Sequence, residues 1–113
     1  MTQQNKVKVA FKIHHDLLNQ MQQAYRAQYG KKGKSQWIAE AIDELLKQDN
    51  FSELVLEEKV TAKLEAYPQA IDVSLDLRYR LDEAIAQCRK KDPFKHGMQS
   101  AIIRTAIIQK LLE

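Results

Sequence analysis

Near its start the chain carries the stretch Val7-Lys8-Val9-Ala10-Phe11-Lys12-Ile13. Because successive side chains of a strand point to opposite faces, this alternation predicts a strand with its apolar residues toward a core. The other side chains, those of Lys8, Ala10 and Lys12, would then face outward. A strand is not stable alone and even a two-stranded pair is marginal. A second strand must therefore come from elsewhere in the chain.

Size and composition limit the possibilities. The chain has 113 residues, which is one compact domain by the usual relation of length to domain count. Its start is polar, which predicts no signal peptide, and its apolar runs are too short to predict a membrane span. The single cysteine, Cys88, fits a reducing cytoplasm. The formal charge of +3 alone does not require an anionic partner.

An internal repeat supplies the second strand. The stretch Val73-Ser74-Leu75-Asp76-Leu77 alternates as residues 9–13 do, which places Asp72, Ser74 and Asp76 outward. Each predicted strand is followed by two helical patterns separated by a break rich in turn residues. Ser35 and Ser100 stand near the start of the second helix in each copy, and Ser35 is a candidate N-cap. The two predicted strands would pair with each other.

Between the repeats we predict a connector helix. Asn50 is a candidate cap, Glu53 stands three residues later as in a capping box, and Pro68 would end the helix. Its apolar positions, at helical spacing, are Leu56, Val60, Leu64 and Tyr67. The expected organisation is a single compact domain over 1–113, made of a first unit at 7–48, a connector helix at 49–69 and a second unit at 70–113.

A short strand with outward polar residues, followed by two helices, resembles the ribbon-helix-helix (Arc/MetJ/CopG) superfamily. Residues 7–46 resemble one copy and residues 71–112 another, and a two-copy chain is similar to TraY-type relaxosome accessory proteins. The resemblance implies a mainly α fold. Two ribbon-helix-helix units would form a pseudo-dimer that shares a two-stranded antiparallel ribbon, joined by the connector helix. The chain would be a monomer in solution, with several molecules able to assemble on adjacent DNA sites.

The resemblance also implies double-stranded DNA as the partner, with the ribbon in the major groove. It assigns base contact to the outward positions of both strands, Lys8, Ala10, Lys12, Asp72, Ser74 and Asp76. Lysine suits the acceptor pair of guanine, and aspartate can accept from cytosine. The alternative is that Asp72 and Asp76 pair across the ribbon with Lys8 and Lys12, which would weaken the base-reading surface.

Phosphate contacts are expected at the start of each second helix, where free N–H groups and the helix dipole attract anions. The residues expected there are Lys31, Lys32, Lys34, Ser35, Lys95 and Ser100. Such contacts fix the position of a protein on DNA without reading its sequence. The alternative is a plain capped helix that follows a solvated basic loop.

Other chemistries fit the sequence poorly. Gly33-Lys34-Ser35 imitates the end of a phosphate-binding loop, but Gln28 stands where that motif needs its first glycine. The spacing of histidines and Cys88 matches no metal motif, so we expect no metal or other cofactor. Cys88 and Trp37 are expected in the core. No nucleophile, base and orienting residue can be assembled, so we do not expect an enzyme.

The sequence therefore predicts a sequence-specific DNA-binding protein. Its expected role is that of an accessory factor of the relaxosome in conjugative plasmid transfer, with a relaxase or other transfer protein as a further partner. One alternative role is a transcriptional autorepressor. A different class is a protein-interaction module such as an antitoxin, which the two aspartates of the second strand favour.

Overall fold

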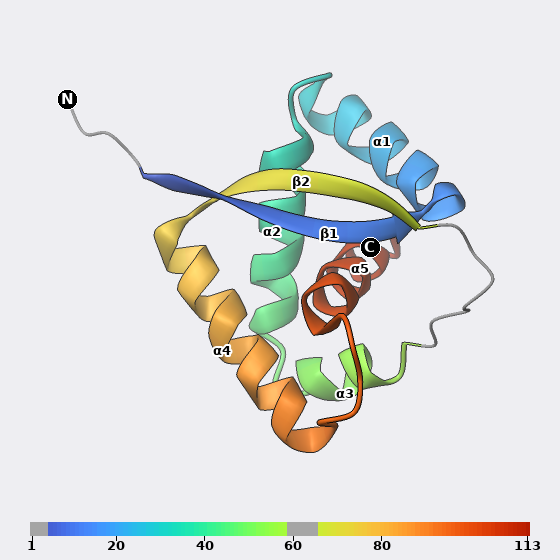
Figure 1. Cartoon of the computed structure of the whole chain (residues 1–113). Helices are drawn as coiled ribbons and strands as arrows, with labels where there is room; N and C mark the ends of the chain where they lie inside the picture. The colour runs from blue at the N-terminus through green and yellow to red at the C-terminus, as the bar shows by residue number, and fades with distance from the viewer. Residues whose placement is uncertain (1–4, 59–65) are drawn as a thin grey trace.

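The computed structural model describes residues 5–58 and 66–113. Over these ranges the chain forms one two-stranded sheet and five helices (Figure 1). In chain order the elements are β1 (Lys6–His14), α1 (His15–Tyr29), α2 (Lys34–Leu46), α3 (Phe51–Leu56), β2 (Ala66–Ser74), α4 (Leu75–Lys91) and α5 (Met98–Leu111).

The predicted fold class, a mainly α chain of two ribbon-helix-helix units forming a pseudo-dimer, is wrong. Over the described ranges the structure has five helices and a single antiparallel sheet, whose strands come from the N-terminal region and the middle of the chain. The two halves do not stand as units, because neither has a sheet of its own. β1 and β2 pair with each other, α2 packs against α5, and the buried residues of both halves form one core.

The second strand was predicted to continue too far along the chain, although Val73 is buried and Asp72 and Ser74 are exposed in β2 as predicted. Leu75 and Leu77 were expected to point inward from a strand, but β2 ends at Ser74 and both leucines belong to α4. The reason is a helix start: the Ser74 hydroxyl accepts a hydrogen bond from the Leu77 N–H, which satisfies one of the free donors of the first turn. Asp76 in that turn favours the start further through the helix dipole.

The predicted connector helix is present in part and wrong at its C-terminal end. Among the described residues of the range 49–69, Phe51–Leu56 is helical, and from Ala66 onward the chain is strand. Two of the apolar positions expected on this helix, Val60 and Leu64, lie outside the described residues. Pro68, expected to end the helix, lies within β2 opposite Lys12.

Pro68 is tolerated in β2 because of its register. The N–H and carbonyl of Lys12 turn away from β2 and bond to side chains of α5. The ladder therefore needs no N–H from the residue opposite Lys12, and proline, which has none, can stand there.

The core lies beneath one face of the sheet. The register pairs Val9 with Ile71 and Val7 with Val73 on the inner face, and Ala10 with Ala70 on the outer face. The predicted alternation of residues 7–13 is confirmed, since Val9, Phe11 and Ile13 are buried and Val7 is half-buried. Trp37 and Cys88 are buried as predicted.

Two glycines shape the helix breaks. Gly30 ends α1 with a φ of 86°, and Gly97 precedes α5 with a φ of 67°. Both values lie in the left-handed region that glycine adopts without a steric penalty. In the described part of the chain no helix combines the length and the apolar character that crossing a membrane requires.

Candidate functional site

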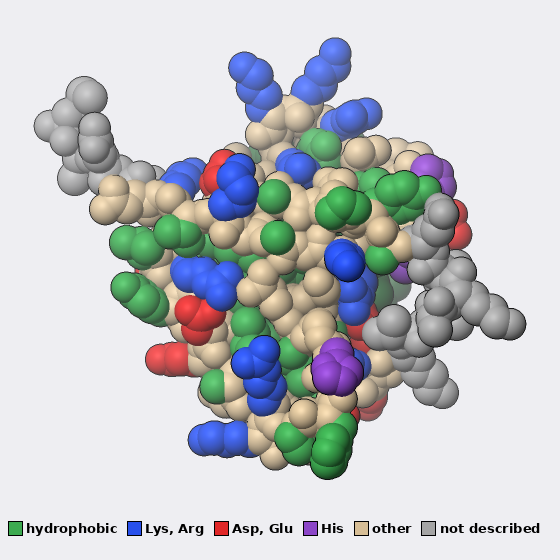
Figure 2. All heavy atoms as spheres, viewed as in Figure 1, with side chains coloured by type: hydrophobic (Ala, Val, Ile, Leu, Met, Phe, Trp, Pro, Cys, Tyr) green, Lys and Arg blue, Asp and Glu red, His purple; other side chains and the backbone are tan. Residues whose placement is uncertain are grey.

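The outer side of the sheet is a continuous exposed surface, which we call the ribbon face. It is made of Lys6, Lys8, Ala10 and Lys12 from β1 and Pro68, Ala70, Asp72 and Ser74 from β2. All of these are exposed except Ala70, which is half-buried. The helices pack against the opposite side, where the core lies, so none of the described helices covers the ribbon face (Figures 1 and 2).

Charge on the ribbon face is unevenly divided between the strands. Its three lysines all stand on β1, while β2 contributes one carboxylate, that of Asp72. The Lys8 ammonium lies 3.7 Å from the Asp72 carboxylate, with side chains 70% and 53% exposed. An ion pair this exposed contributes about 0–1 kcal/mol and exchanges readily for another partner. Lys12 faces Pro68 across the ribbon, and Ala10 faces Ala70 at its centre.

The remaining predicted base-contact residues are divided between the ribbon and α4. Ser74 is exposed opposite Lys6, but its hydroxyl caps α4. Asp76 lies in the first turn of α4, where its carboxylate is 3.8 Å from Arg80. Of the pairing across the ribbon that was the alternative to base contact, the part between Asp72 and Lys8 is present. Asp76 does not take part in it, because Asp76 lies in α4 and not on the strand.

The starts of α2 and α5 lie at opposite edges of the ribbon. The Ser35 hydroxyl accepts a hydrogen bond from the Asp72 N–H of β2 at 3.1 Å. The Ser100 hydroxyl accepts one from the Lys12 N–H of β1 at 3.0 Å. Ser35 is therefore not the N-cap that was predicted; Gly33 occupies that position and Gly97 the equivalent one. Each serine hydroxyl can still donate its own hydrogen to a further acceptor.

These two helix starts differ from those of α1 and α4. The first turns of α1 and α4 each hold an aspartate, and their N-caps, His14 and Ser74, accept a hydrogen bond through the side chain. α2 and α5 have neither an acidic residue in the first turn nor a side-chain cap. Their first N–H groups have no acceptor within the helix. The helix starts beside the ribbon are therefore the ones suited to an anion.

The predicted phosphate-contact lysines are in different situations. Lys31 and Lys32 are exposed in the loop between α1 and α2, where Figure 2 shows basic side chains projecting at the top of the view. The Lys34 ammonium lies 3.4 Å from the Gln69 side-chain oxygen of β2. Lys31 and Lys32 can therefore move to meet a phosphate, while Lys34 is partly engaged with the ribbon.

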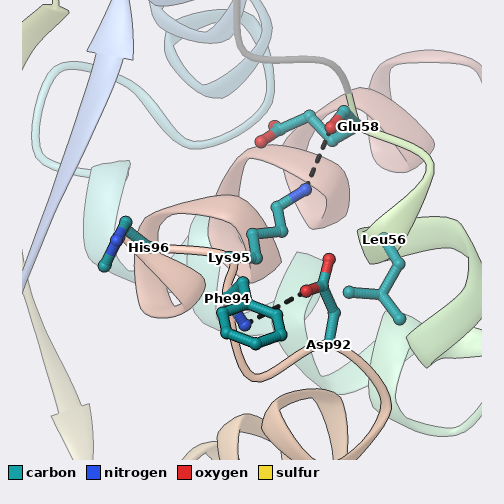
Figure 3. A pocket seen from close by; sticks show the side chains of 6 residues that line it. All are labelled: Leu56, Glu58, Asp92, Phe94, Lys95 and His96. Carbon is teal, nitrogen blue, oxygen red and sulfur yellow. Dashed lines mark hydrogen bonds between the residues drawn. The ribbon is translucent and has the colours of Figure 1, made fainter.

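Lys95 is tied to the protein itself. Its ammonium donates to the carbonyls of Val55, at 3.2 Å, and Glu58, at 2.9 Å, at the end of α3. Figure 3 shows it pointing toward Glu58 in a surface hollow lined by Leu56, Glu58, Asp92, Phe94, Lys95 and His96. The bonds to α3 account for its position, and a phosphate contact would require breaking them.

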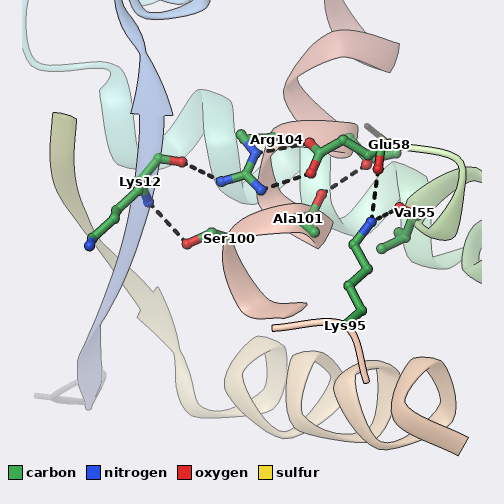
Figure 4. Close-up of polar contacts among 8 residues, drawn as sticks. Lys12, Val55, Glu58, Lys95, Ser100, Ala101 and Arg104 are labelled. Carbon is green, nitrogen blue, oxygen red and sulfur yellow. Dashed lines mark hydrogen bonds and ion pairs between the residues drawn. The ribbon is translucent and has the colours of Figure 1, made fainter. Parts of the chain in front are cut away.

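Side chains of α5 also hold the outer edge of β1. Gln99 donates to the Ala10 carbonyl at 2.6 Å. Arg104 donates to the Lys12 carbonyl at 2.8 Å, as Figure 4 shows. The sequence did not predict that these two side chains contact β1, because their partners are 89 and 92 positions away along the chain. Lys6 was also missed, although the alternation of residues 7–13 extends one step further back to it.

No family model, curated protein or solved structure matches the chain. The resemblance to ribbon-helix-helix proteins stays a prediction. Over residues 5–58 and 66–113, no three histidine, cysteine, aspartate or glutamate side chains come together in a way that could hold a metal ion.

Proposed function

We propose that the protein binds double-stranded DNA by laying its ribbon face in the major groove. The observation that carries the proposal is the exposed two-stranded ribbon, with three lysines around a centre of two alanines. Paired strands lie about 5 Å apart, and a two-stranded ribbon with its side chains fits a groove about 12 Å wide. The small side chains of Ala10 and Ala70 let the middle of the ribbon approach the base edges closely.

Two further features support DNA over other anions. The uncapped starts of α2 and α5 lie at the two edges of the ribbon, where the two sugar-phosphate backbones beside a major groove would run. The exposed Lys31 and Lys32 extend the basic surface on one side. The ribbon would read bases through Lys8 and Lys12, and the helix starts would hold phosphates.

The competing class, a protein-interaction module, was favoured by two aspartates on the second strand. Asp72 is on the ribbon face and paired with Lys8, but Asp76 belongs to α4. The acidic character that favoured this class is therefore reduced to one carboxylate, and DNA binding remains our proposal. The two cellular roles predicted from sequence, relaxosome accessory factor and autorepressor, both need a specific duplex site in the cytoplasm. A footprint on the DNA upstream of the gene tests the autorepressor role, and a footprint on an origin of transfer tests the accessory role.

The direct experiment is selection of duplexes from a random pool by the purified chain, followed by methylation interference on the selected site. Lysine contacts to guanine use N7 and O6 in the major groove, so methylation of guanine N7 at a few positions should block binding. Failure to enrich any sequence would reject specific binding. Enrichment without interference at guanine N7 would reject the proposed use of the major groove.

A further inference from the structure

We propose that Arg104, locked by Glu58, is a positioning residue that holds the β1 half of the ribbon in place for sequence reading. The inference rests on the proposed DNA binding and adds to it a specificity-determining residue that touches no DNA. The Arg104 side chain is only 14% exposed and that of Glu58 13%. Neither is placed to meet a duplex lying on the ribbon face.

The geometry is a three-way bridge. Nε of Arg104 donates to Glu58 Oε2 at 2.9 Å and Nη2 donates to Oε1 at 2.7 Å, which is the two-pronged pairing that guanidinium and carboxylate form best. The remaining Nη1 donates to the backbone carbonyl of Lys12 at 2.8 Å. Figure 4 shows the guanidinium between β1 and the segment that follows α3. The chain after α3 is thus fastened through Arg104 to the strand that carries Lys12.

The bridge fixes the backbone at the position proposed to read a base. The Lys12 N–H is held by Ser100 and its carbonyl by Arg104, so both polar groups of this residue are bonded to α5. A lysine side chain has four rotatable bonds of its own, and the backbone from which it projects decides which base it reaches. Fixing that backbone therefore favours one DNA register over neighbouring ones.

Among the described residues, no arginine of α2 holds β2 in the way that Arg104 holds β1. Arg104 stands four residues after Ser100, and the residue four after Ser35 is Ala39, which has no group that could bond to β2. The lysines of the ribbon face also stand on β1, not on β2. The more firmly held edge is thus the one that carries the basic side chains, which is expected if β1 is the half that discriminates between sequences.

The test compares Arg104→Met with Lys110→Met as a matched control. The Lys110 side chain is 10% exposed and pairs at 3.1 Å with Glu44, whose side chain is 42% exposed, so its loss also removes the ion pair of a buried cation, but one that touches no ribbon residue. We expect Arg104→Met to weaken binding to the selected site about tenfold and to random duplex by less than about twofold. Lys110→Met should leave the ratio of the two affinities unchanged.

A double mutant separates positioning from a general loss of stability. If Arg104 acts through Lys12, then Lys12→Ala with Arg104→Met should lose no more specific affinity than Lys12→Ala alone. Full additivity of the two losses would overturn the proposal, as would equal weakening on both duplexes. In the DNA-free protein, amide exchange at Lys12 should be faster in Arg104→Met than in Lys110→Met, and equal rates would also overturn it.

Failure of this inference can be distinguished from failure of the proposed DNA binding, even if one variant does not fold. If Arg104→Met does not fold, Glu58→Gln and Arg104→Lys take its place, because each keeps the bulk of the side chain but breaks the two-pronged pair. If the unaltered protein selects no DNA at all, the proposed function fails and this inference with it. A protein that selects DNA and keeps its discrimination in these variants refutes the inference alone.

Discussion

Replacing Lys12 with alanine should damage sequence discrimination more than replacing Lys8. Both ammonium groups project from the ribbon face, but their neighbours across the ribbon differ. Lys8 faces the Asp72 carboxylate at 3.7 Å, whereas Lys12 faces Pro68, which offers no charge. To reach a base, Lys8 must give up its ion pair, and Lys12 has no such partner on the opposing strand to leave.

The magnitudes follow from that difference. A good side-chain contact to a base edge discriminates by about 1–3 kcal/mol, and an ion pair as exposed as that of Lys8 contributes about 0–1 kcal/mol. We therefore expect Lys12→Ala to cost about 2–3 kcal/mol on the selected site and Lys8→Ala about 1–2 kcal/mol, after subtracting the ion pair. On random duplex both losses should be much smaller. Asp72→Asn, which releases Lys8, should strengthen binding to both duplexes.

The assay is a fluorescence anisotropy titration of labelled duplexes, one with the selected site and one of random sequence and equal length, at several salt concentrations. Lys31→Ala and Lys32→Ala serve as controls, because these loop lysines are proposed to meet phosphates. Each substitution should weaken binding to both duplexes alike and reduce the slope of log affinity against log salt by about 0.9.

The pattern of losses decides the matter. If all four lysine variants lost the same affinity for both duplexes, the ribbon would be a general basic surface. Base reading by Lys8 and Lys12 would then be refuted. If none of them lost affinity, the ribbon face would serve a protein partner. A larger loss for Lys8 than for Lys12 would contradict the role given to the Asp72 ion pair.

Three further predictions concern stability and reactivity. Ile102 is fully buried, so Ile102→Ala should lower the free energy of unfolding by about 2–5 kcal/mol in urea denaturation, and a loss below about 1 kcal/mol would contradict its place in the core. The hydrogen bonds from Lys47 and Arg80 lower the pKa of Asp43, so its contribution to stability is present above the ordinary aspartate pKa and is lost as pH falls through the lowered one. Asp43→Asn should therefore flatten the acid side of the stability curve, measured by denaturation at a series of pH values; an unchanged curve would refute this. Burial raises the pKa of the Cys88 thiol, so a thiol reagent should modify it only as the protein unfolds, and rapid reaction of the native protein would contradict that burial.

The first strand could be predicted because its signal is local. Alternation over residues 7–13 depends only on the pleat, and the structure places Lys8, Ala10 and Lys12 outward from it. The second strand could not be placed the same way, since Pro68 and Gln69 interrupt its apolar alternation and Leu75 and Leu77 continue that alternation into a helix. The capping hydroxyl of Ser74 outweighed two apolar residues at strand spacing.

The role of a site residue could be predicted only where that role follows from the local sequence around it. The exposure of Lys31 and Lys32 follows from a polar loop between two helices. The roles of Ser100 and Arg104 depend on which strand edge α5 packs beside, and that is a property of the assembled core. Lys95 was predicted from its charge, but the carbonyl groups at the end of α3 compete for that charge, which no local pattern indicates.

The separation of the two strands along the chain has a consequence for biosynthesis. β1 ends at His14 and β2 ends at Ser74, so the ribosome adds sixty residues (74 − 14) between completing the first strand and completing its partner. At about 5–20 residues per second, β1 waits about 3–12 s before it can pair. During that time its apolar side chains, those of Val9, Phe11 and Ile13, have no sheet to complete, and both strand edges are unpaired. The nascent chain in this interval is the form of the protein most exposed to aggregation and to capture by chaperones.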